Sequence, residues 1–191
     1  MKIAFTGTHS VGKSTLAKAV YDKISNKYPN MVFYDNVVRS LMNEVPINEK
    51  GNSYMQMRLL AENIKIMSTT DFIVDRSILD PLAYLSYQIK NNNPSPLDKE
   101  VELINNIMAF DVAKMYDYLF YIPIEFDLIP DGVRSENEEY RIFIDKELQK
   151  KLKQCKCSNL YTITGTVEQR TNKVLEIIEG DHKWKYHLIY Q

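Results

Sequence analysis

The chain has 191 residues, of which 45% are hydrophobic and 26% are charged, and its formal net charge at pH 7 is -1. This composition is ordinary for a soluble globular domain, and the near-neutral charge gives no attraction toward nucleic acid or an anionic membrane. No apolar run approaches the roughly 18 residues that span a bilayer, and Met1 leads directly into an apolar strand pattern. We therefore expect one cytoplasmic domain over residues 1–191, bound to neither nucleic acid nor membrane.

The first predicted strand, residues 2–6, is followed by a phosphate-binding motif. Residues Gly7 to Ser14 fill every fixed position of the pattern G-x-x-x-x-G-K-[ST], and a helical pattern begins at Thr15. The backbone N–H groups of such a loop surround phosphate, its lysine reaches the β- and γ-phosphates, and its serine ligates Mg²⁺. We therefore expect ATP and Mg²⁺ as cofactors, with nucleotide contacts from Gly7, His9, Ser10, Val11, Gly12, Lys13, Ser14 and Thr15.

The rest of the chain alternates strand and helix patterns. Apolar runs predict strands at 31–35, 71–75, 118–123 and 159–163, and apolar spacing of three and four residues predicts helices at 54–67, 79–90 and 97–116. This alternation is typical of an α/β fold in which helices cover both faces of a parallel sheet. We expect a three-layer sandwich with a five-stranded parallel sheet, and we look for chemistry where each strand ends.

Asp75 and Arg76 come directly after the third strand. The carboxylate of Asp75 is suited either to deprotonating an attacking hydroxyl or to holding Mg²⁺, and the planar guanidinium of Arg76 is suited to binding phosphate. The alternative is a surface salt bridge or a helix cap. The neighbouring phosphate-binding motif favours the functional interpretation.

Two arginines follow the fourth strand. Arg134 and Arg141 are seven residues apart, so they share one face if the segment is helical. We expect a helical lid over about residues 125–150 whose arginines stabilise charge on the transferring phosphoryl group. The alternative is a solvated helix face on which three acidic residues neutralise the arginines: Glu136, Glu138 and Glu139.

These motifs, together with the run from Thr162 to Arg170, occur in the order seen in the P-loop nucleoside and nucleotide kinase superfamily. The chain resembles most the small AAA-type ATPase group that includes the ribosylnicotinamide kinase domain of bacterial NAD-biosynthesis regulators. The resemblance also extends to deoxynucleoside and thymidylate kinases, and it covers nearly the whole chain. It implies that Asp75 and Arg76 match the Asp/Glu-Arg pair of those kinases, that Arg134 and Arg141 are lid arginines, and that three residues lie beside the adenine: Gly165, Thr166 and Val167.

The end of the second strand departs from this pattern. Relatives often carry a glutamate three residues before an arginine there, but Asn36 holds that position relative to Arg39, and Asp35 lies one residue earlier. We interpret Asp35 and Arg39 as acceptor-site residues and leave the general base open between Asp35 and Asp75. Gln56 resembles a base-contacting glutamine of deoxynucleoside kinases, although an exposed position on its helix is the equal alternative.

Other features carry less information. Cys155 and Cys157 lack the further ligands that a zinc site needs, so we expect free thiols. The lysines from 146 to 153 are interpreted as a solvated face, and the apolar tail at 184–190 as a segment that docks on the body or on a second copy, which leaves a homodimer open.

Three function classes remain. The leading one is an ATP- and Mg²⁺-dependent kinase acting on a nucleoside or nucleoside monophosphate, with ribosylnicotinamide as the alternative acceptor. A GTP-dependent switch is disfavoured because Asn172-Lys173-Val174-Leu175 lacks the aspartate that reads guanine. A nucleotide sensor or partner-binding module without catalysis is disfavoured because Lys13, Ser14, Asp75 and Arg76 are all present.

Overall fold

Five parallel strands form the centre of the molecule. The computed structural model describes residues 1–35, 52–91, 96–128 and 135–189, with side chains described as far as Gly180. The sheet has the order β2-β3-β1-β4-β5, and every neighbouring pair is parallel. The strands are β1 (Lys2–Thr6), β2 (Val32–Tyr34), β3 (Phe72–Asp75), β4 (Tyr118–Tyr121) and β5 (Leu160–Thr162). The predicted α/β fold and five-stranded parallel sheet are therefore confirmed.

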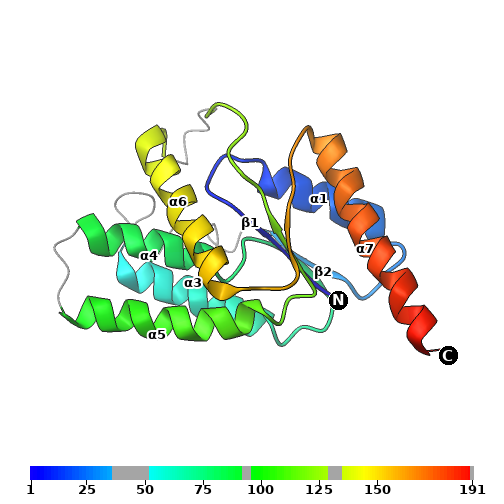
Figure 1. The fold of residues 1–191 in the computed structure, drawn as a ribbon, viewed down its shortest axis with the longest axis horizontal. Helices are drawn as coiled ribbons and strands as arrows, with labels where there is room; N and C mark the ends of the chain where they lie inside the picture. Colours follow the sequence, from blue (N-terminus) through cyan, green and yellow to red (C-terminus); the bar gives the residue numbers. More distant parts are fainter. Residues whose placement is uncertain (36–51, 92–95, 129–134, 190–191) are drawn as a thin grey trace.

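Helices cover both faces of the sheet, which gives three layers (Figure 1). One face carries α1 (Lys13–Ile24) and α7 (Val167–Ile189). The other carries four helices: α3 (Ser53–Ile66), α4 (Asp80–Asn91), α5 (Pro96–Ala113) and α6 (Glu138–Cys155). The three-layer sandwich expected from the alternating patterns is thus present.

Burial explains why the strand patterns were easy to recognise. The three central strands are almost continuously apolar and fully buried, as at Ile3, Ile73 and Leu119, because helices cover a parallel sheet on both sides. The predicted strands agree with the observed ones to within two residues at either end. Helix α5 ends at Ala113, three residues before the predicted end at 116.

The strand order places the ends of β1, β3 and β4 side by side. Strand β1 pairs with β3 on one side and with β4 on the other, so the connections leaving the centre of the sheet run in opposite directions. Ligands of open α/β sheets bind at such a point, outside the carboxyl ends of the strands. The segments after β1, β3 and β4 therefore converge at one edge of the sheet.

One sequence interpretation needs correction and another is confirmed. Lys151 does not belong to a solvated face: it is 3% exposed, and its ammonium bonds Glu102 at 3.1 Å and Asn106 at 3.0 Å. Cys155 and Cys157 are free thiols, as expected. Across the described ranges, every helix is too short or too polar to cross a lipid bilayer.

Candidate nucleotide-binding site

Two glycines shape the loop between β1 and α1. A Cβ on Gly7 would lie 2.5 Å from the carbonyl oxygen of Ile122, so a side chain there would collide with the backbone just beyond β4. Gly12 has φ of +86° and occupies the N-cap position of α1, a conformation that glycine adopts without steric cost. The loop therefore packs tightly against the sheet edge and leads straight into the N-terminus of a helix, where backbone N–H groups attract anions.

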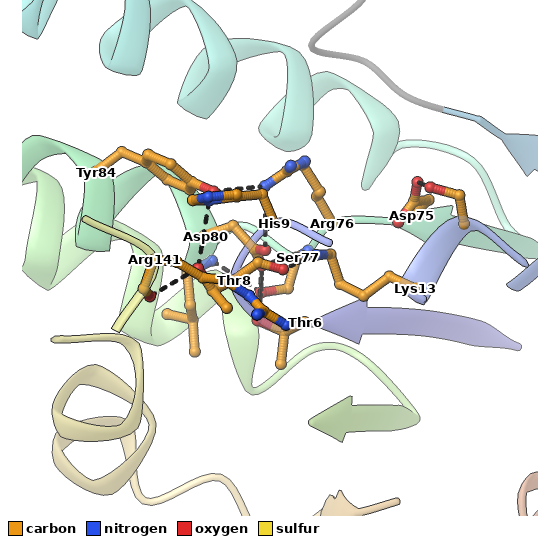
Figure 2. A network of polar contacts seen from close by, with 12 residues as sticks. Thr6, Thr8, His9, Lys13, Asp75, Arg76, Ser77, Asp80, Tyr84 and Arg141 are labelled. Carbon is orange, nitrogen blue, oxygen red and sulfur yellow. Dashed lines mark hydrogen bonds and ion pairs between the residues drawn. The ribbon is translucent and has the colours of Figure 1, made fainter. Parts of the chain in front are cut away.

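Lys13 and Ser14 connect this loop to its surroundings. Lys13 is 5% exposed and its ammonium donates to the carbonyl of Thr8 at 2.5 Å. The Ser14 hydroxyl donates to one carboxylate oxygen of Asp75, at the end of β3, while the second oxygen of Asp75 is buried and has no hydrogen-bond partner among the described residues. Figure 2 shows Lys13 and Asp75 beside the loop. Hydroxyl and carboxylate oxygens are the ligands that Mg²⁺ prefers, so Ser14 and Asp75 fit the cation expected there.

Arg76 follows Asp75 with an unusual backbone. Its φ is +126°, a value rare for a residue with a side chain. Its guanidinium donates to the Tyr84 hydroxyl at 3.4 Å, lies over the Tyr84 ring at 5.6 Å and is 3.8 Å from the Asp80 carboxylate. Burial disfavours the cation, but Tyr84, Asp80 and Asp75 together raise the pKa of Arg76 above its ordinary value. A permanent positive charge is thus fixed beside the phosphate-binding loop.

Asp80 organises the turn between β3 and α4. One of its oxygens accepts from Thr6 Oγ1 at 2.6 Å, from the Ser77 backbone N–H at 2.9 Å and from Ser77 Oγ at 2.9 Å. This reciprocal arrangement caps the start of α4. Burial raises the pKa of Asp80, although Lys13 and Arg76 favour its ionised form. Asp80 therefore fixes both Arg76 and the end of β1.

Arg141 lies on α6, within the segment predicted to form a lid. Asn137 caps α6, which begins at Glu138, so the helix that carries Arg141 does not extend over residues 135–137 toward Arg134. Arg134 itself lies outside the described residues. Arg141 is fully buried, which excludes the solvated face as well. Its guanidinium donates to the carbonyls of Ser10 at 3.3 Å and Phe126 at 2.9 Å and pairs with Glu138 at 3.2 Å.

The other side of the loop is held by Arg170. This residue is 2% exposed, donates to the Val11 carbonyl at 2.7 Å and pairs with Glu125 at 2.5 Å. The same Glu125 carboxylate accepts from the backbone N–H of Gly165 at 3.0 Å. Thr166 and Gln169 then cap α7 reciprocally, and Val167 is its first residue. The segment expected beside adenine is therefore tied, through Glu125 and Arg170, to the phosphate-binding loop.

The remaining predicted residues lie around this centre. Asp35 directly follows β2, whose register with β3 pairs Tyr34 with Val74, so Asp35 comes next to Asp75 along the two strands. It is exposed. Thr15 is exposed in the first turn of α1, whereas His9 is buried and its ring lies 5.5 Å from that of Tyr140. Arg39 lies outside the described residues.

Gln56 is buried, which excludes the exposed alternative. It is 6% exposed and lies in the first turns of α3, and its amide oxygen has no hydrogen-bond partner among the described residues. Because α3 crosses back from the carboxyl end of β2 to the start of β3, its N-terminal turns lie at the edge of the sheet that carries the site. Gln56 is therefore a buried amide at the edge where the acceptor is expected.

Sequence reasoning missed Glu125, Arg170 and Asp80 as site residues. Arg170 lay within the run quoted for the family resemblance, and the Thr166 to Gln169 spacing was a readable capping signal. Neither signal predicts that Arg170 is buried and donates to Val11, a loop residue 159 positions earlier in the sequence. Ser77 and Asp80 have the Ser-x-x-Asp spacing, which indicates the start of a helix.

Comparison with known proteins identifies a family to which the chain is similar. Residues 2–170 match the family model described as "AAA domain". No curated protein matches the chain.

Solved structures show the same fold at low identity. Deoxyadenosine kinase from M. mycoides, with products dCMP and dCDP bound, superposes with a TM-score of 0.69 at 20% identity, covering 94% of this chain and 99% of that one. Thymidylate kinase from Ehrlichia chaffeensis gives 0.59 at 18% identity, covering 93% and 98%. The NadR protein in complex with NR gives 0.68 at 15% identity, covering 91% of this chain but 50% of that one. The chain therefore belongs to the AAA domain family and has the fold of the P-loop nucleoside and nucleotide kinases.

Proposed function

We propose that this protein is an ATP- and Mg²⁺-dependent phosphotransferase that acts on a nucleoside or a nucleoside monophosphate. The observation that carries the proposal is the contact between Ser14 and Asp75, with an unpartnered Asp75 oxygen beside it and the Arg76 cation next along the chain. A serine and a strand-end carboxylate are the pair with which P-loop proteins hold Mg²⁺, and the adjacent guanidinium adds a charge suited to a transferring phosphoryl group.

The residues around the phosphate-binding loop form the donor half of the site, the part that binds ATP, and each has a distinct role there. Lys13 and the backbone N–H groups of the loop bind the β- and γ-phosphates. Ser14 and Asp75 hold Mg²⁺, which supplies neutralisation of charge on the phosphate oxygens. Arg76 and Arg141, and Arg134 in the segment before α6, stabilise the charge that builds on the equatorial oxygens of the transferring group.

When the acceptor is a nucleoside, its hydroxyl oxygen attacks the γ-phosphorus, so one P–O bond forms while the bond to the β–γ bridging oxygen breaks and ADP leaves. A nucleoside monophosphate attacks in the same way through a phosphate oxygen, which has no hydroxyl proton to lose. For a nucleoside, a base is also needed. The hydroxyl proton goes to a carboxylate. We assign this base to Asp35, because Asp75 already accepts from Ser14 whereas Asp35 is exposed at the end of the adjacent strand. Arg39 lies four residues further along the same segment, and we assign it to the acceptor.

Gln56 supports a nucleobase on the acceptor. A buried amide oxygen without a partner is costly. The exocyclic amino group of a base donates to such an oxygen, and the amide N–H₂ of the same side chain donates to a ring nitrogen or carbonyl of the base. The acceptor half of the site therefore offers base recognition that a simple sugar or amine would leave unused.

The solved structures support the same class of substrate. They contain dCMP and dCDP in the deoxyadenosine kinase from M. mycoides, dATP in another structure of that protein, and NR in the NadR protein. The NadR complex favours nicotinamide riboside as the alternative acceptor. A nucleotide sensor without catalysis is the remaining alternative.

The test is release of ADP from ATP and Mg²⁺ across a panel of nucleosides, deoxynucleoside monophosphates and nicotinamide riboside. We expect turnover that depends on one acceptor class. Asp75→Asn should raise the Mg²⁺ concentration needed for half-maximal rate, and Asp35→Asn should lower kcat without that shift. Absence of acceptor-dependent turnover would leave the sensor alternative. The same Mg²⁺ shift in both variants would contradict the division of roles.

A further inference from the structure

Phe126 is a large aromatic side chain that is exposed beside the phosphate-binding loop. It lies in the segment after β4, and 52% of its surface is exposed. A single exposed apolar side chain is ordinary on a protein surface. Phe126 is different because its backbone and its ring both contact arginines that also hold the phosphate-binding loop.

Two buried arginines fix the position of Phe126 relative to the loop. The carbonyl of Phe126 accepts from the Arg141 guanidinium at 2.9 Å, and the same guanidinium donates to the carbonyl of Ser10. The Arg170 guanidinium lies over the Phe126 ring, 5.2 Å from its centroid, and donates to the carbonyl of Val11. Ser10 and Val11 are consecutive residues of the loop. Because the ring is already held in place, a contact between it and a ligand costs little ordering.

One face of the Phe126 ring is available to a ligand. The Arg170 guanidinium covers the other face, and since half of the side chain is exposed, the open face points to solvent. Val167 is also exposed and lies one helical turn before Arg170, on the same side of α7. An aromatic face and an apolar side chain therefore lie close together beside the loop, a combination that suits a flat ring.

The turn before α7, which we expect beside adenine, uses two of its backbone N–H groups within the protein. The N–H of Gly165 donates to the Glu125 carboxylate at 3.0 Å, and the N–H of Thr166 donates to the Gln169 side chain at 2.9 Å. A base that lies against this turn gains no hydrogen bond from either group while these contacts persist. Its binding therefore depends more strongly on contacts with the faces of its ring.

We propose that Phe126 stacks against the base of the nucleoside triphosphate, and that this contact distinguishes a nucleotide from a bare polyphosphate. The stacking contact rests on the proposed function, in which the loop holds the phosphates of ATP. An aromatic ring binds a base through its π-face, and Arg170 on the far side keeps the Phe126 ring in place. A polyphosphate without a base binds the loop but makes no contact with Phe126.

Isothermal titration calorimetry on the full chain, with Mg²⁺ and without an acceptor, tests this contact apart from phosphoryl transfer. The ligands are AMP-PNP, an ATP analogue that is not hydrolysed, and inorganic tripolyphosphate. Phe126→Ala should raise the Kd of AMP-PNP about 10-fold, because the stacking face is lost. Phe126→Trp should keep most of the affinity, since an indole offers a similar face. The Kd of tripolyphosphate should be the same in all three proteins.

Tyr54→Ala is the matched control. Tyr54 is another exposed aromatic residue beside an arginine, with Arg58 6.0 Å from its ring centroid, but it lies at the start of α3. Its removal should leave the Kd of AMP-PNP unaltered.

Three results would overturn the stacking contact, and they differ in what they say about phosphoryl transfer. An equal Kd of AMP-PNP in the wild type and in Phe126→Ala would exclude stacking and leave the proposed function standing. A parallel loss of tripolyphosphate affinity in Phe126→Ala would show that Phe126 shapes the loop instead of contacting the base. A wild-type protein that binds neither ligand would overturn the stacking contact together with the proposed function.

Discussion

The two halves of the candidate site differ in the kind of polar atom they leave unpaired. Around the phosphate-binding loop, the buried atoms without a partner among the described residues include Nε of Arg141 and Nε of Arg170, which are donors. Toward β3 and α3 they are oxygens of Asp75, Gln56 and Asn63, and an Asp80 oxygen there lies 3.8 Å from the Arg76 guanidinium. One half thus presents N–H groups to an anion, while the other presents oxygens to a cation, a hydroxyl or an amino group.

This difference indicates which half of the site would select the substrate. The donor half is held by charged contacts to backbone carbonyls, such as those from Arg170 to Val11 and from Arg141 to Ser10, and such contacts position any triphosphate. The acceptor half depends on side-chain oxygens whose partners must come with the ligand. Substitutions on the two sides should therefore fail in different ways.

The largest effect is expected at the donor half, for Lys13→Ala. Removing the ammonium takes away the group placed to contact the β- and γ-phosphates, so acceptor-dependent kcat/KM should fall about 1000-fold. Steady-state ADP release measures it. Lys18→Ala is the matched control, since Lys18 is exposed on the same helix, where its ammonium pairs with Asp22 and lies over the Tyr21 ring. Turnover unchanged in Lys13→Ala would refute phosphoryl transfer at this loop.

Arg141→Lys should give the next largest loss. Lysine keeps the charge but cannot reproduce the planar fork that reaches two carbonyls at once. We expect kcat to fall about 100-fold with a much smaller change in ATP affinity, if the guanidinium acts on the transition state. Glu138→Gln removes the ion pair and should leave kcat nearly unaltered. Equal losses in kcat and ATP affinity would instead assign Arg141 to ordinary binding.

Gln56→Leu should separate function from stability in the acceptor half. Leucine fills the site without an unpaired amide, so the free energy of unfolding should stay equal or rise by about 1 kcal/mol. The acceptor KM should rise about 10-fold while the KM for ATP stays constant. Urea unfolding and two-substrate kinetics provide the measurements.

Asn63→Leu is the control for that experiment. Asn63 is also buried on α3 and also has an unpartnered amide oxygen, but it lies two turns further from the site edge. Its replacement should not alter either KM. A shift in the acceptor KM for Asn63→Leu as large as that for Gln56→Leu would indicate a general disturbance of the helix.

The smallest expected effect is that of Asp80 on the pH dependence of the free energy of unfolding. Because burial raises the pKa of Asp80 in the folded protein, the folded state holds this proton more tightly than the unfolded chain. The contribution of Asp80 to stability is therefore complete below the unfolded pKa of about 4 and is lost as pH rises through the folded pKa, with a slope of at most about 1.4 kcal/mol per pH unit. Asp80→Asn keeps an acceptor oxygen for the Ser77 N–H and should remove this slope. Parallel stability curves for the two proteins would contradict the inference.

Much of the fold was predictable because it is encoded locally. The buried strands read as continuous apolar runs, and the loop from Gly7 to Ser14 carries its geometry in two glycines and its chemistry in two side chains. Asp75 and Arg76 followed from their place at a strand end. The contacts of Arg170, Glu125 and Arg141 were not predictable, since they depend on which distant carbonyl each guanidinium reaches after the layers have packed.

The same limit applies to the segment expected to form a lid. A seven-residue spacing places two arginines on one face only inside a helix, and α6 begins at Glu138, after the position of Arg134 in the sequence. The outward position of large apolar side chains on α5, such as Leu103 and Ile107, was also not predictable. Periodicity predicts that a helix has an apolar face but not which way that face points.

The link from Gly165 through Glu125 and Arg170 to Val11 also bears on the entropy of binding. Because charged contacts already hold the phosphate-binding loop and the segment proposed to lie beside adenine together, little backbone freedom would be lost on binding of a triphosphate. Binding of the diphosphate product would likewise cost little backbone freedom. Rigid binding of both nucleotides makes departure of the product, rather than bond breaking, the natural slow step of a catalytic cycle at such a site.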